Sequence, residues 1–200
     1  MKLLKTSLLC LSLFSFNNAF ACSPEDYKTA ALYSEQAFGV FFQDSNEEMI
    51  NKASGLLDKS VELCPDNAQL ILNRANFNLL AGNYEKVKSD YKLAAKLQPL
   101  TPEVSLLECV LAEYTQAPKD EWTDCYRQAE QKFTQRQKER LSNSYVLATL
   151  LAENPDSETI KAQWLEKNKN DNDEVTVELR AVLKGSPDRI ALMKKVFPLK

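Results

Sequence analysis

Apolar residues recur along most of the chain at the three- and four-residue spacing that places them on one face of an α-helix. Residues that favour helices are abundant, and the 200 residues include only 4 glycines. Short segments rich in proline, serine, asparagine and aspartate separate the periodic stretches. The pattern predicts an all-α protein with helices over residues 24–43, 46–65, 68–81, 84–97, 102–115, 119–133, 135–153, 157–167, 174–184 and 187–196.

Local signals mark where the helices begin. Ser23-Pro24-Glu25-Asp26 combines a capping serine, a proline at the first helical position and acids in the first turn. Ser45-Asn46-Glu47-Glu48 has the serine–glutamate spacing of a capping box. Residues 174–183 are ambiguous, because Val175-Thr176-Val177 also favours a strand. Since the connections between successive helices are short, we expect antiparallel hairpins stacked in chain order.

The first 21 residues resemble a cleavable export signal. Lys2 and Lys5 precede an apolar stretch at 8–16, and Ala19-Phe20-Ala21 has the form of a cleavage site. The apolar stretch is about half as long as the roughly 20 residues that cross a bilayer. We therefore expect export and cleavage after Ala21, giving a soluble periplasmic protein. Lipidation of Cys22, which the bulky Phe20 disfavours, and an extracellular location are the alternatives.

One segment closely resembles a tetratricopeptide repeat. Pro65 and Pro99 are separated by 34 positions, the period of this helical-hairpin family. Between them stand family-like residues at the positions where paired helices pack and turn: Ile71, Ala75, Gly82, Tyr84, Tyr91 and Ala94. Asn78 and Val87 depart from the family pattern. The resemblance is best over residues 66–99, degenerate over 34–65 and 100–133, and absent from the helical segment 135–200.

The resemblance implies a single α-solenoid domain over residues 22–200, with a compact helical bundle as the alternative. In such an array the first helix of each repeat lines a concave surface that binds peptides or proteins. The residues carried over to this surface in the best repeat are Gln69, Leu72, Asn73, Asn76 and Leu79. The family's carboxylate-clamping members need basic residues in neighbouring repeats, where this chain has Phe38, Phe42, Glu103 and Leu107. We therefore expect an apolar or mixed interface.

Four cysteines follow residue 21, and they allow three disulfide pairings. Facing residues in an antiparallel hairpin are equally distant from its turn. The midpoint of Cys22 and Cys64 is residue 43, that of Cys109 and Cys125 is residue 117, and both fall in predicted turns. Packed helices bring facing Cα atoms to roughly 4–5 Å, which permits a disulfide. The spacing thus predicts these two bridges, with four buried thiols as the alternative.

The composition argues against metal binding, catalysis and nucleotide or nucleic-acid binding. The chain has no histidine, the commonest metal ligand and proton shuttle, and no Cys-x-x-Cys pair. Glycine-rich phosphate loops are missing, and a net charge of −3, which becomes −5 without residues 1–21, gives no reason to expect nucleic-acid binding. We expect no enzymatic activity, cofactor, metal or stable membrane insertion.

The sequence favours a periplasmic protein–protein interaction module. An immunity protein that inhibits a toxin delivered into the periplasm is the alternative, because small size, export, disulfides and acidity suit it equally.

Overall fold

The computed structural model describes residues 22–200 apart from 45, 137–140, 186, 198 and 200. Within these residues the chain forms ten α-helices and no strand, which confirms the predicted all-α class. The helices are α1 Pro24–Gln43, α2 Glu47–Leu63, α3 Ala68–Ala81, α4 Tyr84–Leu97, α5 Pro102–Tyr114, α6 Lys119–Gln135, α7 Asn143–Leu151, α8 Ser157–Lys167, α9 Glu174–Lys184 and α10 Arg189–Val196.

The helices begin and end where capping residues satisfy the backbone. The Ser23 hydroxyl accepts a hydrogen bond from the Asp26 N–H at 3.1 Å, and Thr101 caps α5 in the same way. Gly82, at φ 80°, adopts the left-handed conformation that turns the chain from α3 into α4. Asp173 accepts from the Thr176 N–H at 3.0 Å, so residues 174–184 form helix α9.

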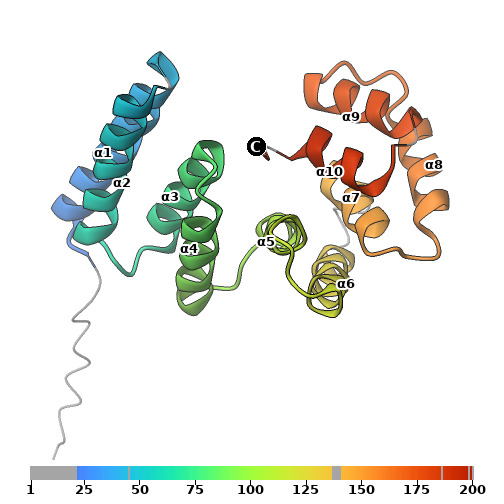
Figure 1. The fold of residues 1–200 in the computed structure, drawn as a ribbon, viewed down its shortest axis with the longest axis horizontal. Coiled ribbons are helices and arrows are strands. Elements are labelled where there is room, and N and C mark those ends of the chain that lie inside the picture. The colour runs from blue at the N-terminus through green and yellow to red at the C-terminus, as the bar shows by residue number, and fades with distance from the viewer. Residues whose placement is uncertain (1–21, 45, 137–140, 186, 198, 200) are drawn as a thin grey trace, which may run out of the picture.

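Consecutive helices pair as antiparallel hairpins: α1 with α2, α3 with α4, and α5 with α6 (Figure 1). The pairs follow one another in chain order, and α7 to α10 form a tighter group beyond α6 (Figure 1). Adjacent hairpins pack less closely between α4 and α5 than between α2 and α3. The predicted stack of hairpins is therefore present, with a loose junction at its middle.

Both predicted disulfides are present. Cys22 and Cys64 join the start of α1 to the end of α2 with a Cα–Cα distance of 5.0 Å. Cys109 and Cys125 join α5 to α6 with a Cα–Cα distance of 5.4 Å. Each bridge lies across one hairpin, so the turn-midpoint argument located both turns correctly.

Two large groups of buried residues meet at α5. The N-terminal cluster consists of Ala30, Val61, Cys64, Ala68, Leu70, Ile71, Leu72, Ala75, Leu79, Val87, Tyr91, Ala94 and Leu111. The C-terminal cluster consists of Leu106, Cys109, Val110, Tyr126, Ala129, Phe133, Val146, Leu147, Ala148, Leu151, Trp164, Leu179, Leu183, Leu192 and Met193. Helix α5 contributes to both clusters, so it joins the two halves of the array.

Arg74 fixes the register of three helices in the N-terminal half. From α3 its guanidinium contacts Asp90 of α4 through two nitrogens, at 2.7 and 3.1 Å, and Asp58 of α2 at 3.0 Å. The Asp90 side chain is only 6% exposed, so its buried negative charge requires the bidentate ion pair with Arg74 to compensate for lost hydration.

Arg189 anchors the last helix to the middle of the chain. Its guanidinium lies 4.7 Å from the Trp122 ring centre and 5.1 Å from that of Tyr126. It also makes two ion-pair contacts with Glu113 of α5, at 2.7 and 3.0 Å, and donates to the Leu151 carbonyl at 2.8 Å. These contacts hold α10 against α5, α6 and α7.

The prediction of one helix over residues 135–153 is correct for 143–151, where α7 lies, but wrong at its start. Helix α6 continues to Gln135, and α7 starts only at Asn143, where the Ser142 hydroxyl accepts from the Tyr145 N–H at 3.1 Å. Leu141 has φ 64°, a conformation that cannot continue a helix.

The start of α2 also differs from the prediction. Its capping residue is Asn46, which accepts from the Met49 N–H at 2.9 Å, whereas the capping box was placed on Ser45. Ser45 and the signal-like residues 1–21 lie outside the described residues. No helix in the described part of the chain combines the length and hydropathy that a membrane crossing requires.

The two disulfides should stabilise the fold to different extents. They close loops with sequence separations of 42 and 16 residues. Loop-closure entropy then gives about 4 kcal/mol for Cys22–Cys64 and about 3 kcal/mol for Cys109–Cys125. In urea titrations we expect the double Cys→Ser variant of the first bridge to lose about 1 kcal/mol more unfolding free energy than that of the second. The reverse order would show that loop closure does not set their contributions.

Candidate functional site

All five residues predicted to line a binding surface lie on α3. Gln69 and Asn76 are exposed and Asn73 is half-buried, whereas Leu72 and Leu79 are 8% and 5% exposed. Both leucines belong to the N-terminal cluster. The face of α3 therefore presents amide side chains above buried leucines.

The amides of α3 are held in part by neighbouring side chains. Asn73 donates to the Ser34 hydroxyl of α1 at 3.0 Å and accepts from the Gln69 amide at 3.1 Å. Ser34 is buried, so Asn73 also ties α3 to α1. The Asn76 amide makes no hydrogen bond to another described residue. It is therefore the amide most available to an incoming backbone.

An aromatic cluster lies beside this amide row at the end of α1. Phe41 and Phe38 pack edge-to-face on Phe77 of α3, with ring centres 5.4 and 6.4 Å apart. Phe42 contacts Phe41 at 5.6 Å, yet its side chain is 73% exposed. Phe42 thus extends a partly buried aromatic cluster to the surface, where it offers apolar contact area. Phe38 and Phe42 are positions that the family resemblance had assigned to the concave surface.

Helix α5 carries the next of these first-helix positions. We call the positions that the repeat resemblance assigns to one surface, including Phe42, Asn76 and Leu107, the inner face. Leu107 and Val104 of α5 are half-buried and pack against the N-terminal cluster. Beyond α10, Leu199 packs against both clusters. The sequence analysis missed this contribution, because periodicity carries no signal for where a short terminal segment packs.

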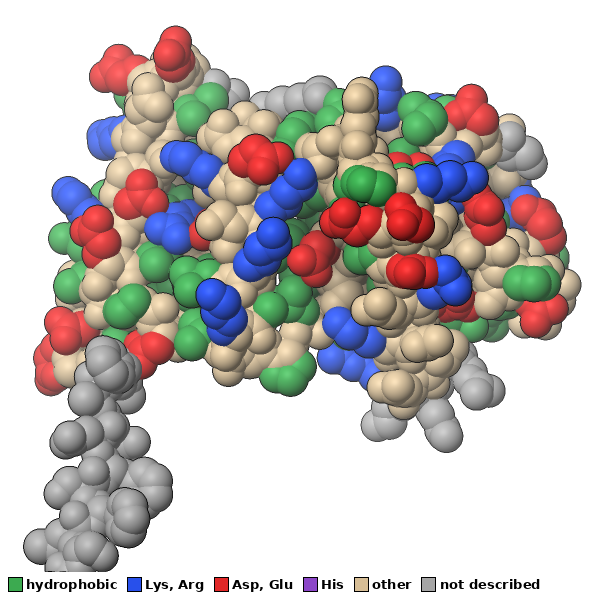
Figure 2. Space-filling view, turned by 60° about the horizontal axis from the view of Figure 1, so that its bottom comes forward, with side chains coloured by type: hydrophobic (Ala, Val, Ile, Leu, Met, Phe, Trp, Pro, Cys, Tyr) green, Lys and Arg blue, Asp and Glu red, His purple; other side chains and the backbone are tan. Residues whose placement is uncertain are grey.

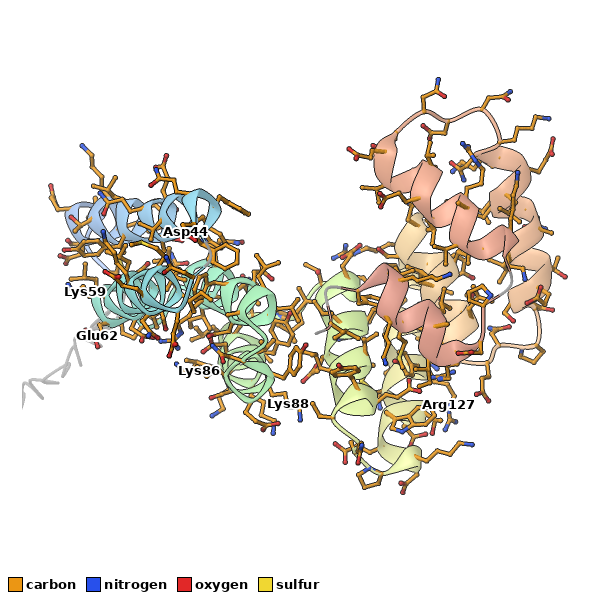
Figure 3. The ribbon with its side chains drawn as sticks, turned by 45° about the horizontal axis from the view of Figure 1, so that its top comes forward. Asp44, Lys59, Glu62, Lys86, Lys88 and Arg127 are labelled. Atoms are coloured by element: carbon orange, nitrogen blue, oxygen red, sulfur yellow. A yellow bond between two sulfur atoms is a disulfide. The ribbon has the colours of Figure 1, made fainter. Side chains whose placement is uncertain are left out.

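The opposite side of the array is strongly charged. Lys59 and Glu62 of α2, Lys86 and Lys88 of α4, and Arg127 of α6 extend away from the helices (Figure 3). In the view of Figure 2, Lys and Arg side chains lie beside Asp and Glu side chains. Charged side chains of both signs therefore cover the face seen in Figure 2.

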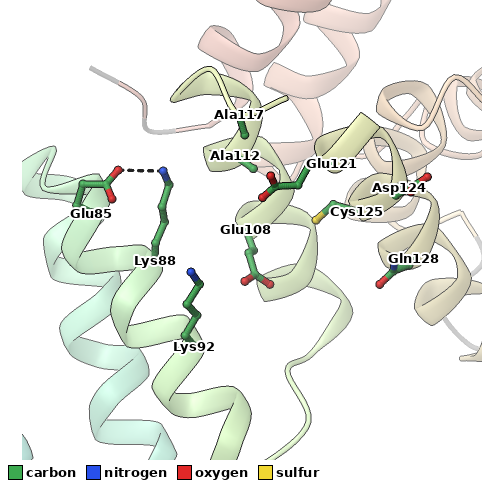
Figure 4. Close-up of a pocket in the computed structure, with 10 residues that line it drawn as sticks. All are labelled: Glu85, Lys88, Lys92, Glu108, Ala112, Ala117, Glu121, Asp124, Cys125 and Gln128. Atoms are coloured by element: carbon green, nitrogen blue, oxygen red, sulfur yellow. Dashed lines mark hydrogen bonds and ion pairs between the residues drawn. The ribbon is translucent and has the colours of Figure 1, made fainter. Parts of the chain in front are cut away.

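A groove of about 560 Å³ opens between α4, α5 and α6 (Figure 4). Lys88 pairs with Glu85 at 2.9 Å along one wall, and Lys92 extends toward Glu108 on α5 (Figure 4). The lining residues are Glu85, Lys88, Lys92, Glu108, Ala112, Ala117, Glu121, Asp124, Cys125 and Gln128. We call this the charged groove. It was also missed, because its side chains come from three helices that only the packing brings together.

Glu108 is a half-buried carboxyl in the wall of this groove. Burial raises the pKa of its carboxyl, and the positive charges of Lys132 and Lys92 partly oppose this rise. Behind it, the fully buried Tyr91 hydroxyl has no hydrogen-bond partner among the described residues. Burial, followed by the nearby Glu108 charge, raises the pKa of Tyr91.

Among the described residues, no group of three or more His, Cys, Asp and Glu side chains is arranged to hold a metal ion. All four described cysteines are in disulfides. Compared with known proteins, the chain matches no family model and no curated protein. Its function must therefore be inferred from geometry and sequence pattern.

The substitution Glu108→Gln should stabilise the protein in a pH-dependent way. A carboxyl whose pKa is higher in the folded than in the unfolded protein lowers the free energy of unfolding when it is ionised. This cost is absent below the ordinary pKa of 4.5, grows as the pH rises above it, and is complete once the pH exceeds the folded-state pKa. The gain should reach at most about 1 kcal/mol at neutral pH, because solvent screens a half-buried charge. It should shrink as the pH falls and vanish below the ordinary value.

Urea titrations across this pH range measure the effect, with the exposed Glu121→Gln of the same groove as the matched control. If Glu108→Gln destabilises the protein at neutral pH, then the attraction of the Glu108 charge to Lys132 and Lys92 outweighs the cost of burying that charge.

Proposed function

We propose that this chain is a non-enzymatic, exported protein-binding module, in which a TPR-like helical array binds a peptide or protein partner on its inner face. The observation that carries this proposal is the row of amides on α3 lying beside the exposed Phe42. Amides can pair with an extended backbone, and an exposed aromatic side chain supplies apolar contact area.

Burial within the best repeat supports the tetratricopeptide-like array. Ala75, Tyr91 and Ala94, which stand at the family's packing positions, are fully buried, and Gly82 makes the turn between the helices of the hairpin. The hairpins before and after it pack against it in chain order.

The disulfides support export. Such bridges persist in oxidising compartments and are rare where thiols are kept reduced. The Cys22–Cys64 bridge also bears on the lipoprotein alternative, because a sulfur bonded to Cys64 cannot carry a lipid. We therefore favour a soluble periplasmic protein, released by cleavage after Ala21.

Site-specific photocrosslinking in producing cells tests the inner face. A photoreactive residue at Phe42 or Asn76 should crosslink the same partner chain. The exposed positions Asn51 of α2 and Gln131 of α6 serve as controls and should yield little of that product. Equal crosslinking from the control positions, or none from Phe42 and Asn76, would overturn the proposal.

The amides should contribute measurably to partner binding. Each lost amide hydrogen bond costs about 0.5–1.5 kcal/mol, so Gln69→Ala with Asn76→Ala should lower affinity roughly tenfold. Because both side chains are exposed, the free energy of unfolding should change little. The measurement is the crosslinking yield from Phe42 as a function of partner concentration. Asn51→Ala with Gln131→Ala is the matched control, and an equal loss in that variant would exclude a specific role for the α3 amides.

A further inference from the structure

Helix α1 exposes a continuous stripe on the side opposite its buried residues. The residues that α1 buries are Ala30, Ser34 and Ala37. The residues of the stripe follow one another at intervals of three or four, are all exposed, and are Lys28, Leu32, Glu35 and Gly39. We call them the outer stripe of α1. The hairpin of α1 and α2 forms one end of the stack (Figure 1), so no further hairpin of the described chain covers the stripe.

The centre of the outer stripe is apolar and open. Leu32 is 50% exposed, and Ala31 beside it is half-buried. A Cβ atom added at Gly39 would meet no neighbouring side chain or other helix within 4 Å, so the backbone there is open to close approach. End hairpins of helical arrays usually present a polar outer surface, because apolar groups there have no neighbour to cover them. A half-exposed leucine among small residues instead suits contact with a second helix.

Opposite charges flank this apolar centre. Lys28 lies one turn before Leu32, and Glu35 lies about one turn after it. Neither charge makes an ion pair or hydrogen bond with another described residue. The two charges are seven positions and so about 10 Å apart along the helix, too far to pair with each other. Each can therefore pair with a charge on another molecule.

The outer stripe is complementary to itself when two α1 helices pack antiparallel. Facing residues in such a pair are equally distant from the point where the helices cross. If they cross between residues 31 and 32, Lys28 of each copy faces Glu35 of the other, and Leu32 faces Ala31. A parallel pair would instead place Lys28 against Lys28 and Glu35 against Glu35, and its helix dipoles would repel each other.

Neighbouring antiparallel registers do not give this match. Moving the crossing point to residue 30 places Glu25 of one copy against Glu35 of the other. Moving it to between residues 33 and 34 places the apolar Leu32 against Glu35. The order of charged and apolar residues along the stripe therefore selects the register centred between residues 31 and 32.

We propose that two copies of this chain form a twofold-symmetric dimer through the outer stripe of α1, with their α1 helices antiparallel and crossing between residues 31 and 32. Such an interface is isologous, because each copy contributes the same residues and each contact occurs twice. The dimer goes beyond the proposed function, since Asn76 and Leu107 of the inner face lie on α3 and α5. It presents two inner faces at once, so a partner with two binding segments binds more tightly than one with a single segment.

Charge exchange tests the dimer in the purified, disulfide-bonded protein. Sedimentation velocity at increasing protein concentration should show a monomer–dimer equilibrium. Lys28→Glu turns two attractive contacts into two repulsive ones, so it should raise the dimer dissociation constant about tenfold or more, and Glu35→Lys should do the same. The double variant should restore the constant to within about threefold of that of the unsubstituted protein, because it forms both pairs again with the signs reversed.

Lys86→Glu is the matched control, since Lys86 is exposed on α4 and extends away from the helix (Figure 3). It should leave the dissociation constant unchanged. An unsubstituted protein that stays monomeric up to about 1 mM, an equal loss in the Lys86→Glu variant, or a double variant no better than the single ones would rule out the proposed dimer.

A photoreactive residue at Leu32 tests the same contact in producing cells without changing any charge. It should give a product of two copies of this chain, with the crosslink mapped to α1 of the second copy. The exposed Gln131 of α6 is the control position and should give little of this product. A product with a different protein, or a self-crosslink that maps outside α1, would overturn the inference.

Discussion

Helix α5 has to bury apolar side chains on two sides at once, and the rest of the array depends on this. Leu111 completes the N-terminal cluster, whereas Leu106, Cys109 and Val110 belong to the C-terminal cluster. A helical hairpin cannot bury both sides of its apolar face by itself. The helices before and after α5 therefore both bury apolar side chains against it. The Cys109–Cys125 bridge ties α5 to α6 and so determines which side of α5 faces each half.

The elements predictable from sequence were those governed by local chemistry. The capping pattern at Ser23, the left-handed Gly82 and the turn midpoints of the cysteine pairs depend on neighbouring residues or on one hairpin, and all were read correctly. The break between α6 and α7 was placed too early, after residue 133, because residues 135–140 favour helices, whereas α6 ends at Gln135 and Leu141 has a positive φ. Periodicity shows which residues are apolar, but not whether the chain between them stays helical.

The candidate site likewise contains features that local spacing predicts and features that depend on packing between distant helices. Gln69 and Asn76 are exposed on α3 as the repeat implies, because their position on a helix follows from spacing alone. The burial of Leu72 and Leu79 was not predictable, since it depends on how neighbouring elements pack against α3. Likewise, Glu108 meets Lys92 and Lys132 only through the packing of α4, α5 and α6.

The loose packing between α4 and α5 has consequences for the surface and for the stability of the array. On the outer side it leaves room for the charged groove, where Glu108 is half-buried without losing its contact with lysines. Leu199, from beyond α10, packs against both buried clusters. The disulfides lie across hairpins and not across this junction, so covalent bonds fix each pair of helices while only side-chain packing fixes the pairs at the middle of the array.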